Sequence, residues 1–98
     1  MTEFRKKPIV IEAFQMHYHP GSNYDGIGKD QWAHWFREAV FKDEQTPGWV
    51  YLHANGLWVI WTLDGIMEIS PGDYVIRGIK GELYPCKEDV FLATYEAV

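Results

Sequence analysis

Apolar and polar residues follow a helical period in one part of the chain and a strand period in most of the rest. After Asp30, a residue type that often caps helices, apolar residues recur at the i, i+3, i+4, i+7 and i+8 positions. This spacing predicts one principal amphipathic helix over residues 31–42. We expect its apolar stripe to face the core; the stripe consists of Trp32, Trp35, Phe36, Ala39 and Val40.

Strand-like segments lie on both sides of this helix. Residues 8–14 are β-branched and apolar and predict a first strand. Residues 49–54, 57–63 and 66–69 are separated by Asn55-Gly56 and Asp64-Gly65. Such dipeptides favour two-residue hairpin loops, because both central residues of a type I′ turn need positive φ. The pattern therefore predicts an antiparallel meander.

Two-residue loops fix the expected register of that meander. They pair His53 with Trp58 and Tyr51 with Ile60 in the first hairpin, and Ile60 with Ile69 in the second. One face then carries Tyr51, His53, Trp58, Ile60, Thr62, Met67 and Ile69, and the other carries Val50, Leu52, Val59, Trp61, Leu63, Ile66 and Glu68. A single helix cannot cover both faces, so one packs on the remaining strands or contacts a ligand or a second subunit.

Residues 70–87 predict a second, tight hairpin. A Pro71-Gly72 turn precedes an alternating strand over 73–79, and Lys80-Gly81 turns the chain into a short strand over 82–84. Residues 88–91 suggest one helical turn and 92–96 a final strand. We assign structural roles in turns and in the hairpin to Pro71, Gly72, Asp73, Tyr74, Gly78 and Gly81. An alternative is that residues 77–81 offer N–H groups and two cations to a phosphate.

These elements predict an α+β fold: a curved, mainly antiparallel sheet, either a meander or a half-barrel, with one principal helix. The 98 residues, 47% of them hydrophobic and 23% charged, have the size and composition of a single domain over 1–98. The aromatic content of 16% is high, and rings of this kind also serve as stacking or interface platforms. We therefore expect some of them to lie outside the core, and we expect self-association.

Charge and cysteine content exclude several classes of protein. A net charge of −5 argues against sequence-independent binding to nucleic acid, and the basic triplet at 5–7 is read as a solvated strand entry or an anion contact. The single cysteine, Cys86, permits no internal disulfide; we expect a packed thiol, with a nucleophile as the alternative. The apolar runs are too short to span a bilayer, so we expect a cytoplasmic protein.

No cofactor or metal is expected from these residues. His17 and His19 are spaced to point the same way on a strand, but no third ligand follows at short spacing. Residues 17–29 form a polar, glycine-containing stretch that is long for a loop in a small domain, and such loops are usually functional or mobile.

Both ends of the chain carry a resemblance to a known group of proteins. The segments 5–14, 70–87 and 91–96, with the Pro-Gly-Asp-Tyr motif at 71–74, resemble a family of small, mostly uncharacterised bacteriophage and prophage proteins. The resemblance implies a phage accessory protein that acts in the host cytoplasm and modulates host enzymes or defences. Residues 17–63 take no part in it.

The strongest candidate for a binding site is the face with Tyr51, His53 and Trp58. Rings on a sheet face can stack a planar group, while Arg77 or Lys80 supplies charge to an attached phosphate, with Tyr84 near them. Three functions remain open. The first is a non-catalytic binder of a small molecule, such as a nucleotide-type host defence signal. The second is an interaction module that inhibits a host protein, and the third is a small enzyme.

Overall fold

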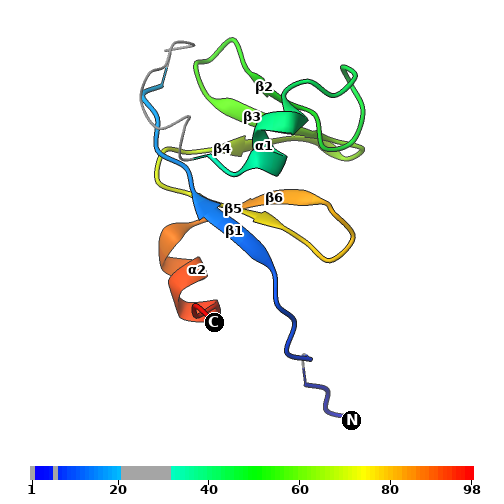
Figure 1. Cartoon of the computed structure of the whole chain (residues 1–98), viewed down its shortest axis with the longest axis vertical. Helices are drawn as coiled ribbons and strands as arrows, with labels where there is room; N and C mark the ends of the chain where they lie inside the picture. The colour runs from blue at the N-terminus through cyan, green and yellow to red at the C-terminus, as the bar shows by residue number, and fades with distance from the viewer. Residues whose placement is uncertain (1, 6, 21–31) are drawn as a thin grey trace.

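Strands make up most of the regular structure. The computed structural model describes residues 2–5, 7–20 and 32–98. Within them, β1-β5-β6 and β2-β3-β4 form two antiparallel sheets, so the fold is α+β (Figure 1). The elements are β1 Glu12–Gln15, α1 His34–Ala39, β2 Val50–Leu52, β3 Trp58–Thr62, β4 Gly65–Ile69, β5 Tyr74–Arg77, β6 Leu83–Cys86 and α2 Glu88–Thr94.

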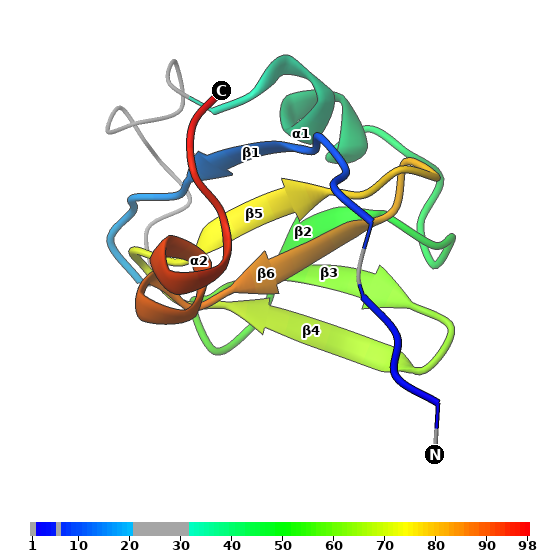
Figure 2. The ribbon, with the colours of Figure 1, turned by 90° about the horizontal axis from the view of Figure 1, so that it is seen from below.

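The single curved sheet expected from the sequence is divided into two. The β2-β3-β4 sheet is the predicted meander, and β6 of the other sheet lies beside its strand β4 (Figure 2). Helix α1 packs across the core, whereas α2 lies against the outside of β5 and β6 (Figure 1). No helix among the described residues is long and apolar enough to cross a bilayer.

Helix α1 buries the stripe that its periodicity predicts. Trp32, Phe36 and Ala39 are buried, and the Trp32 ring meets the rings of Phe36 and Trp58 edge-on, both with centroids 5.3 Å apart. The helix is shorter than the predicted 31–42, and its predicted cap Asp30 lies outside the described residues. Its end is set by the amides of residues 40–42, which bond to carbonyls three residues back and tighten the last turn.

The first hairpin differs from its predicted register by one residue. Leu52 pairs with Trp58 and Val50 with Ile60, because the turn is longer than two residues. The His53 amide bonds to the Leu57 carbonyl at 2.8 Å, the Gly56 amide bonds to the His53 carbonyl, and Gly56 has φ +89°. This is a three-residue loop with a left-handed glycine. A slip of one residue moves Tyr51 and His53 to the opposite face from Trp58, so the predicted face is wrong.

The second hairpin is displaced by two residues and therefore keeps its faces. Thr62 pairs with Gly65 and Ile60 with Met67, so the loop residues are Leu63 and Asp64 rather than Asp64 and Gly65. The Thr62 hydroxyl donates to the Gly65 carbonyl and accepts from the Asp64 amide at 3.2 Å. This hydroxyl closes the tight loop and sets the pairing found between β3 and β4.

The Pro-Gly-Asp motif forms a turn that ties β4, β5 and the end of β1 together. The Asp73 amide bonds to the Ser70 carbonyl at 2.9 Å, with Gly72 at φ +92°, as expected for a type II turn with proline at its second position. The Asp73 carboxylate, 5% exposed, accepts from the Ser70 amide at 2.9 Å. Met16 exchanges two backbone hydrogen bonds with Gly72 and Asp73. This is the structural role expected for the motif.

Strand β1 is shorter and later than predicted. It begins at Glu12 and pairs with β5, whose last residue Arg77 stands opposite Glu12. The chain turns at residues 78–81, where the Gly81 amide bonds to the Gly78 carbonyl at 2.9 Å. Residues 8–11 lie beyond the end of their partner strand, which is why their β propensity does not extend the sheet.

Residues 92–96 do not form the predicted strand, because α2 continues through Thr94. Glu88 and Asp89 occupy its first turn, where the helix dipole favours carboxylates. Phe91 and Tyr95, four residues apart, stack on one another, and Phe91 stacks on Tyr74 with centroids 3.9 Å apart. This contact between α2 and β5 explains why a helix is selected over a strand.

The contact between α2 and its sheet also predicts that the protein loses stability at alkaline pH. Burial first, and then a hydrogen bond with Tyr95, raise the pKa of Tyr84 from 10.0 to about 12. The neutral phenol is thus favoured by folding, so its stabilisation is complete below pH 10 and is lost as the pH rises towards 12. Two pKa units correspond to about 2.7 kcal/mol, which partial exposure reduces to about 1–2 kcal/mol.

Urea unfolding at a series of alkaline pH values measures this loss. We expect Tyr84→Phe to unfold with a shallower pH dependence than the wild type between pH 10 and 12. Tyr51→Phe, which lies on the other sheet, is the matched control and should retain the wild-type slope. Identical slopes for Tyr84→Phe and the wild type would contradict the assignment.

Candidate functional site

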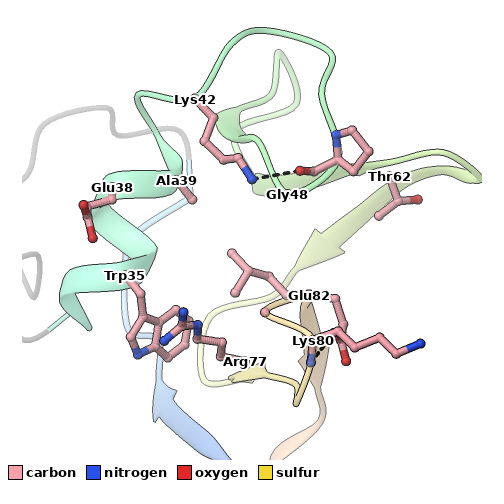
Figure 3. A pocket seen from close by; sticks show the side chains of 12 residues that line it. Trp35, Glu38, Ala39, Lys42, Gly48, Thr62, Arg77, Lys80 and Glu82 are labelled. Carbon is pink, nitrogen blue, oxygen red and sulfur yellow. Dashed lines mark hydrogen bonds between the residues drawn. The ribbon is translucent and has the colours of Figure 1, made fainter.

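A cavity of about 700 Å³ lies between α1, the loop that follows it and the turn between β5 and β6 (Figure 3). Its volume falls in the range of small-molecule sites. Segments from both sheets and from α1 contribute to it, so it is formed only in the folded chain. The lining residues are Trp35, Glu38, Ala39, Lys42, Pro47, Gly48, Thr62, Arg77, Lys80, Gly81, Glu82 and Leu83.

The lining carries the opposite charge to the whole protein. Lys42, Arg77 and Lys80 supply three positive charges and Glu38 and Glu82 two negative charges, which leaves +1 in a chain of net charge −5. Figure 3 shows the Lys42 ammonium and the Arg77 guanidinium on different sides of the cavity, whereas the Lys80 side chain extends away from its centre. An anion in the cavity would meet Lys42 and Arg77 first.

Both carboxylates of the lining already have partners. Glu38 lies 3.3 Å from His34 one turn away on α1. Glu82 accepts from the Lys80 backbone amide at 3.0 Å and lies against Gly78, where a Cβ atom would collide with it. These contacts hold the Glu82 carboxylate at the turn between β5 and β6.

The two inner cations are held loosely enough to change partners. Lys42 Nζ donates to the Pro47 carbonyl at 3.0 Å, and Arg77 Nη1 lies 3.2 Å from Glu12 at the exposed edge of the sheet. An exposed ion pair of this kind contributes little to stability, so exchanging Glu12 for a ligand oxygen costs little. Guanidinium groups also bind phosphates through two parallel hydrogen bonds.

One aromatic ring lines the same cavity. Trp35 is half-buried and packs edge-on against Phe14 with centroids 5.6 Å apart, which fixes the indole in place. Leu83 adds apolar surface opposite α1. The site thus combines two cations with a fixed ring, a combination suited to a planar ligand that carries an anionic group.

The structure brings together two of the six residues predicted to bind a ligand. Arg77 and Lys80 both line the cavity. Trp58 is 7% exposed and is packed in the core against Trp32, so it is not free to stack a ligand. Tyr84 points to the α2 side of its sheet, because it pairs with Ile76 while the neighbouring pair, Arg77 and Leu83, faces the cavity.

Tyr51 and His53 lie on the outer face of the β2-β3-β4 sheet. Tyr51 stacks on Trp49 with centroids 4.1 Å apart, and His53 lies 6.2 Å from Tyr51. The residue pairing puts Trp61 and Ile66 on this face as well. We call the five residues the outer aromatic patch: Trp49, Tyr51, His53, Trp61 and Ile66.

Cys86 and the histidines do not form a reactive cluster with each other. Burial, and then the carboxylates of Asp73 and Asp89, raise the pKa of the Cys86 thiol, which favours the protonated form. Among the described residues, no group of three histidine, cysteine or carboxylate side chains could hold a metal ion. His17 and His19 are exposed, and most of the predicted 17–29 loop lies outside the described residues.

Sequence reasoning missed the helical side of the cavity. Trp35, Glu38, Ala39 and Lys42 follow one another at i, i+3, i+4 and i+7, so they share one face of the chain around α1. This mixed spacing of a ring, a small residue and two opposite charges was available in the sequence. The core stripe at the same period concealed it, because Trp35 and Ala39 belong to both faces.

Comparisons with known proteins show no relative of this chain. The chain matches no protein-family model, no curated protein and no solved structure.

Proposed function

We propose that this protein is a non-catalytic binder of a small anionic molecule, held in the cavity between α1 and the β5-β6 turn. The observation that carries the proposal is the convergence of Lys42 and Arg77 on a cavity with a positive balance of charge in an acidic protein. Charge-assisted hydrogen bonds from two cations are the strongest polar contacts that the cavity can offer.

The ligand class follows from the shape and the ring. A cavity of about 700 Å³ has room for a nucleotide-sized molecule. Its phosphate groups would lie between Lys42 and Arg77, and its planar base against Trp35. Release of Arg77 from Glu12 would accompany binding.

The biological role that we propose is sequestration. The resemblance of both chain ends to small phage proteins implies action in the host cytoplasm, where a binder without turnover can lower the free concentration of a nucleotide-type defence signal. Such a role needs affinity and a stoichiometric amount of protein rather than an acid-base pair. The pairing of Glu38 with His34, and of Glu82 with the Lys80 amide, is consistent with a site that binds without reacting.

The test uses ADP as the probe and calorimetry as the measurement. We expect the wild-type chain to bind ADP, and Arg77→Gln and Lys42→Gln each to weaken binding by about 10- to 150-fold, because a hydrogen bond to a charged group contributes about 1.5–3 kcal/mol. Arg37→Gln is the matched control, since Arg37 is an exposed residue of α1 outside the cavity lining. Its affinity for ADP should equal that of the wild type.

Two results would contradict the proposal. One is the absence of any heat of binding with ADP and with inorganic diphosphate, together with native mass spectra of the protein purified from cells that show no small-molecule adduct. The other is an equal loss of affinity in Arg37→Gln and Arg77→Gln, which would assign the binding to general surface charge.

A second candidate function is supported by the outer aromatic patch. The stacked rings of Trp49 and Tyr51 occupy an outer sheet face, and aromatic side chains in such positions are typical of protein interfaces. In that function the protein inhibits a host protein by docking through this face. Trp49→Ala would then reduce capture of the host protein and leave ADP binding unchanged.

A further inference from the structure

A second cavity lies on the opposite side of the β1-β5-β6 sheet, next to α2. It measures about 460 Å³ and lies between residues 9–11 on one side and α2 with the following residues on the other. We call it the α2 groove. Its lining is mainly apolar and consists of Ile9, Val10, Ile11, Ala13, Tyr74, Phe91, Leu92, Tyr95, Glu96, Ala97 and Val98.

The described part of the segment that precedes β1, residues 2–5 and 7–11, extends away from the two sheets (Figure 1). Figure 1 shows it running beyond β1 at the end of the molecule's longest dimension, which measures 49 Å against 27 and 22 Å for the others. Its apolar side chains are uncovered: Phe4 is 93% exposed and Val10 is 74% exposed. A phenylalanine side chain exposed in this way is a large apolar surface, and such surfaces often mark sites of interaction.

The segment and the groove carry complementary charges. On the segment, Phe4 is preceded by Glu3 and followed by Arg5 and Lys7, and all four residues are exposed. Glu96 lines the groove, and Glu88 and Asp89 form the first turn of α2. A segment with more positive than negative charges and an apolar groove lined by the carboxylate of Glu96 satisfy the requirement for a self-complementary interface.

We propose that two copies of this chain exchange these segments, each placing Phe4 in the α2 groove of the other copy. Ile9 lies in the wall of its own groove, and a chain of five residues, if fully extended, spans about 16 Å from there to Phe4. That length is enough to pass from one copy to the groove of a neighbour related by a two-fold axis. Arg5 then lies against Glu96 of the second copy, and the same two contacts occur twice in the dimer.

The exposed apolar side chains on both partners are the physical reason for the exchange. Leu92 is 60% exposed at the groove and Ile9 is 44% exposed in its wall. A second copy of the segment covers these side chains and buries Phe4 in one step, and an aromatic anchor in an apolar pocket is the usual centre of a protein interface.

Analytical ultracentrifugation of the full chain over a range of micromolar concentrations is the first test. We expect a monomer-dimer equilibrium that Phe4→Ala shifts towards monomer by about tenfold or more in dissociation constant. Phe41→Ala is the matched control, because Phe41 is 86% exposed and lies after α1, outside the groove. Leu92→Asp should also break the dimer, and Leu63→Asp, 81% exposed in the β3-β4 loop, should not.

A mixing experiment distinguishes exchange between copies from other ways of covering the groove. A Phe4→Ala chain keeps an intact groove and a Leu92→Asp chain keeps an intact segment, so a mixture restores one of the two contacts. We expect native mass spectra of an equimolar mixture to show more than twice as much heterodimer as either homodimer, an excess over the 1:2:1 ratio of random pairing. Arg5→Glu combined with Glu96→Arg should likewise recover the dimer that either change alone weakens.

Three outcomes would overturn the proposal. The wild type would stay monomeric at the highest concentration, or Phe4→Ala and Phe41→Ala would weaken the dimer equally, or the mixture would contain no excess of heterodimer. A monomer in which Phe4→Ala lowers stability would mean that the segment folds back onto its own groove. Circular dichroism of each variant checks that a lost dimer is not a lost fold.

Discussion

Trp58→Ala is expected to lower the free energy of unfolding by about 3–5 kcal/mol, the usual cost of removing a large aromatic side chain from a core. Trp58 is 7% exposed and its ring meets Trp32 edge-on, so the change removes the contact that joins β3 to the chain just before α1. Domains of this size are stable by about 5–15 kcal/mol, so the variant loses a large part of its stability.

The measurement is urea unfolding followed by far-ultraviolet circular dichroism, because tryptophan fluorescence would itself change. Trp61→Ala is the matched control: Trp61 belongs to the same strand, but it is half-buried on the opposite face. We expect this control to lose about 1 kcal/mol. The folded fraction of Trp58→Ala should still bind ADP, since Trp58 does not line the cavity.

The opposite result would restore Trp58 as a ligand contact. That result is a variant with nearly the stability of the wild type that no longer binds ADP, which is the behaviour that the sequence pattern alone suggests. A Trp58 in the core and a Trp58 in a binding site therefore predict different effects of the same substitution. Measuring both the stability and the ADP binding of Trp58→Ala separates the two.

The difference between these two interpretations depends on one residue of register. The sequence correctly predicts a hairpin at Asn55-Gly56, because Gly56 does adopt positive φ. Loop length, however, is decided by which amide meets which carbonyl, and His53 bonds to Leu57 instead of lying opposite Trp58 as predicted. Short-range signals locate a turn to within a residue or two. In a strand, an error of one residue in the register moves every side chain to the opposite face.

The sequence predicts local structure correctly where residues close together in the chain determine the backbone geometry. Pro71 and Gly72 fix a type II turn, and the Asp73 carboxylate bonds to a backbone amide three residues away, as expected. The inward face of α1 likewise follows from its period. These features depend on neighbours in the sequence, which is why they could be predicted.

The cavity could be predicted only in part, because its two halves are far apart in the sequence. The sequence predicts Arg77 and Lys80 as ligand contacts because they lie in the segment with Gly78 and Gly81, and both residues line the cavity. Their counterpart Lys42 comes from the loop that follows α1, and nothing local indicates that these segments meet. Packing of α1 across the core brings them together, and that packing is a property of the whole fold.

Tyr18→Phe is expected to lower the free energy of unfolding by about 1–3 kcal/mol, although it removes one oxygen atom. The Tyr18 hydroxyl donates to the Ile69 carbonyl and accepts from the Trp58 amide at 3.3 Å, so it joins the segment after β1 to the paired ends of β3 and β4. Trp58 and Ile69 are both buried, and a hydrogen bond between neutral groups contributes about 0.5–1.5 kcal/mol, so the loss of these two bonds accounts for the effect.

The environment of this hydroxyl supports the size of the effect. Burial raises the pKa of Tyr18, against the opposing influence of the hydrogen bond from Trp58. The phenol is therefore neutral and able to donate at neutral pH, where the stabilities are compared. Tyr51→Phe is the matched control, because Tyr51 lies in the outer aromatic patch, and it should change stability by less than about 0.5 kcal/mol.

Hydrogen exchange at a single amide makes this prediction specific to the bond. In Tyr18→Phe the Trp58 amide should exchange faster relative to the Val59 amide than it does in the wild type, beyond the change that lower global stability gives to both. Equal acceleration of the two amides, or a loss of stability no larger than that of Tyr51→Phe, would show that the hydroxyl does not hold the segment after β1 against the β2-β3-β4 sheet.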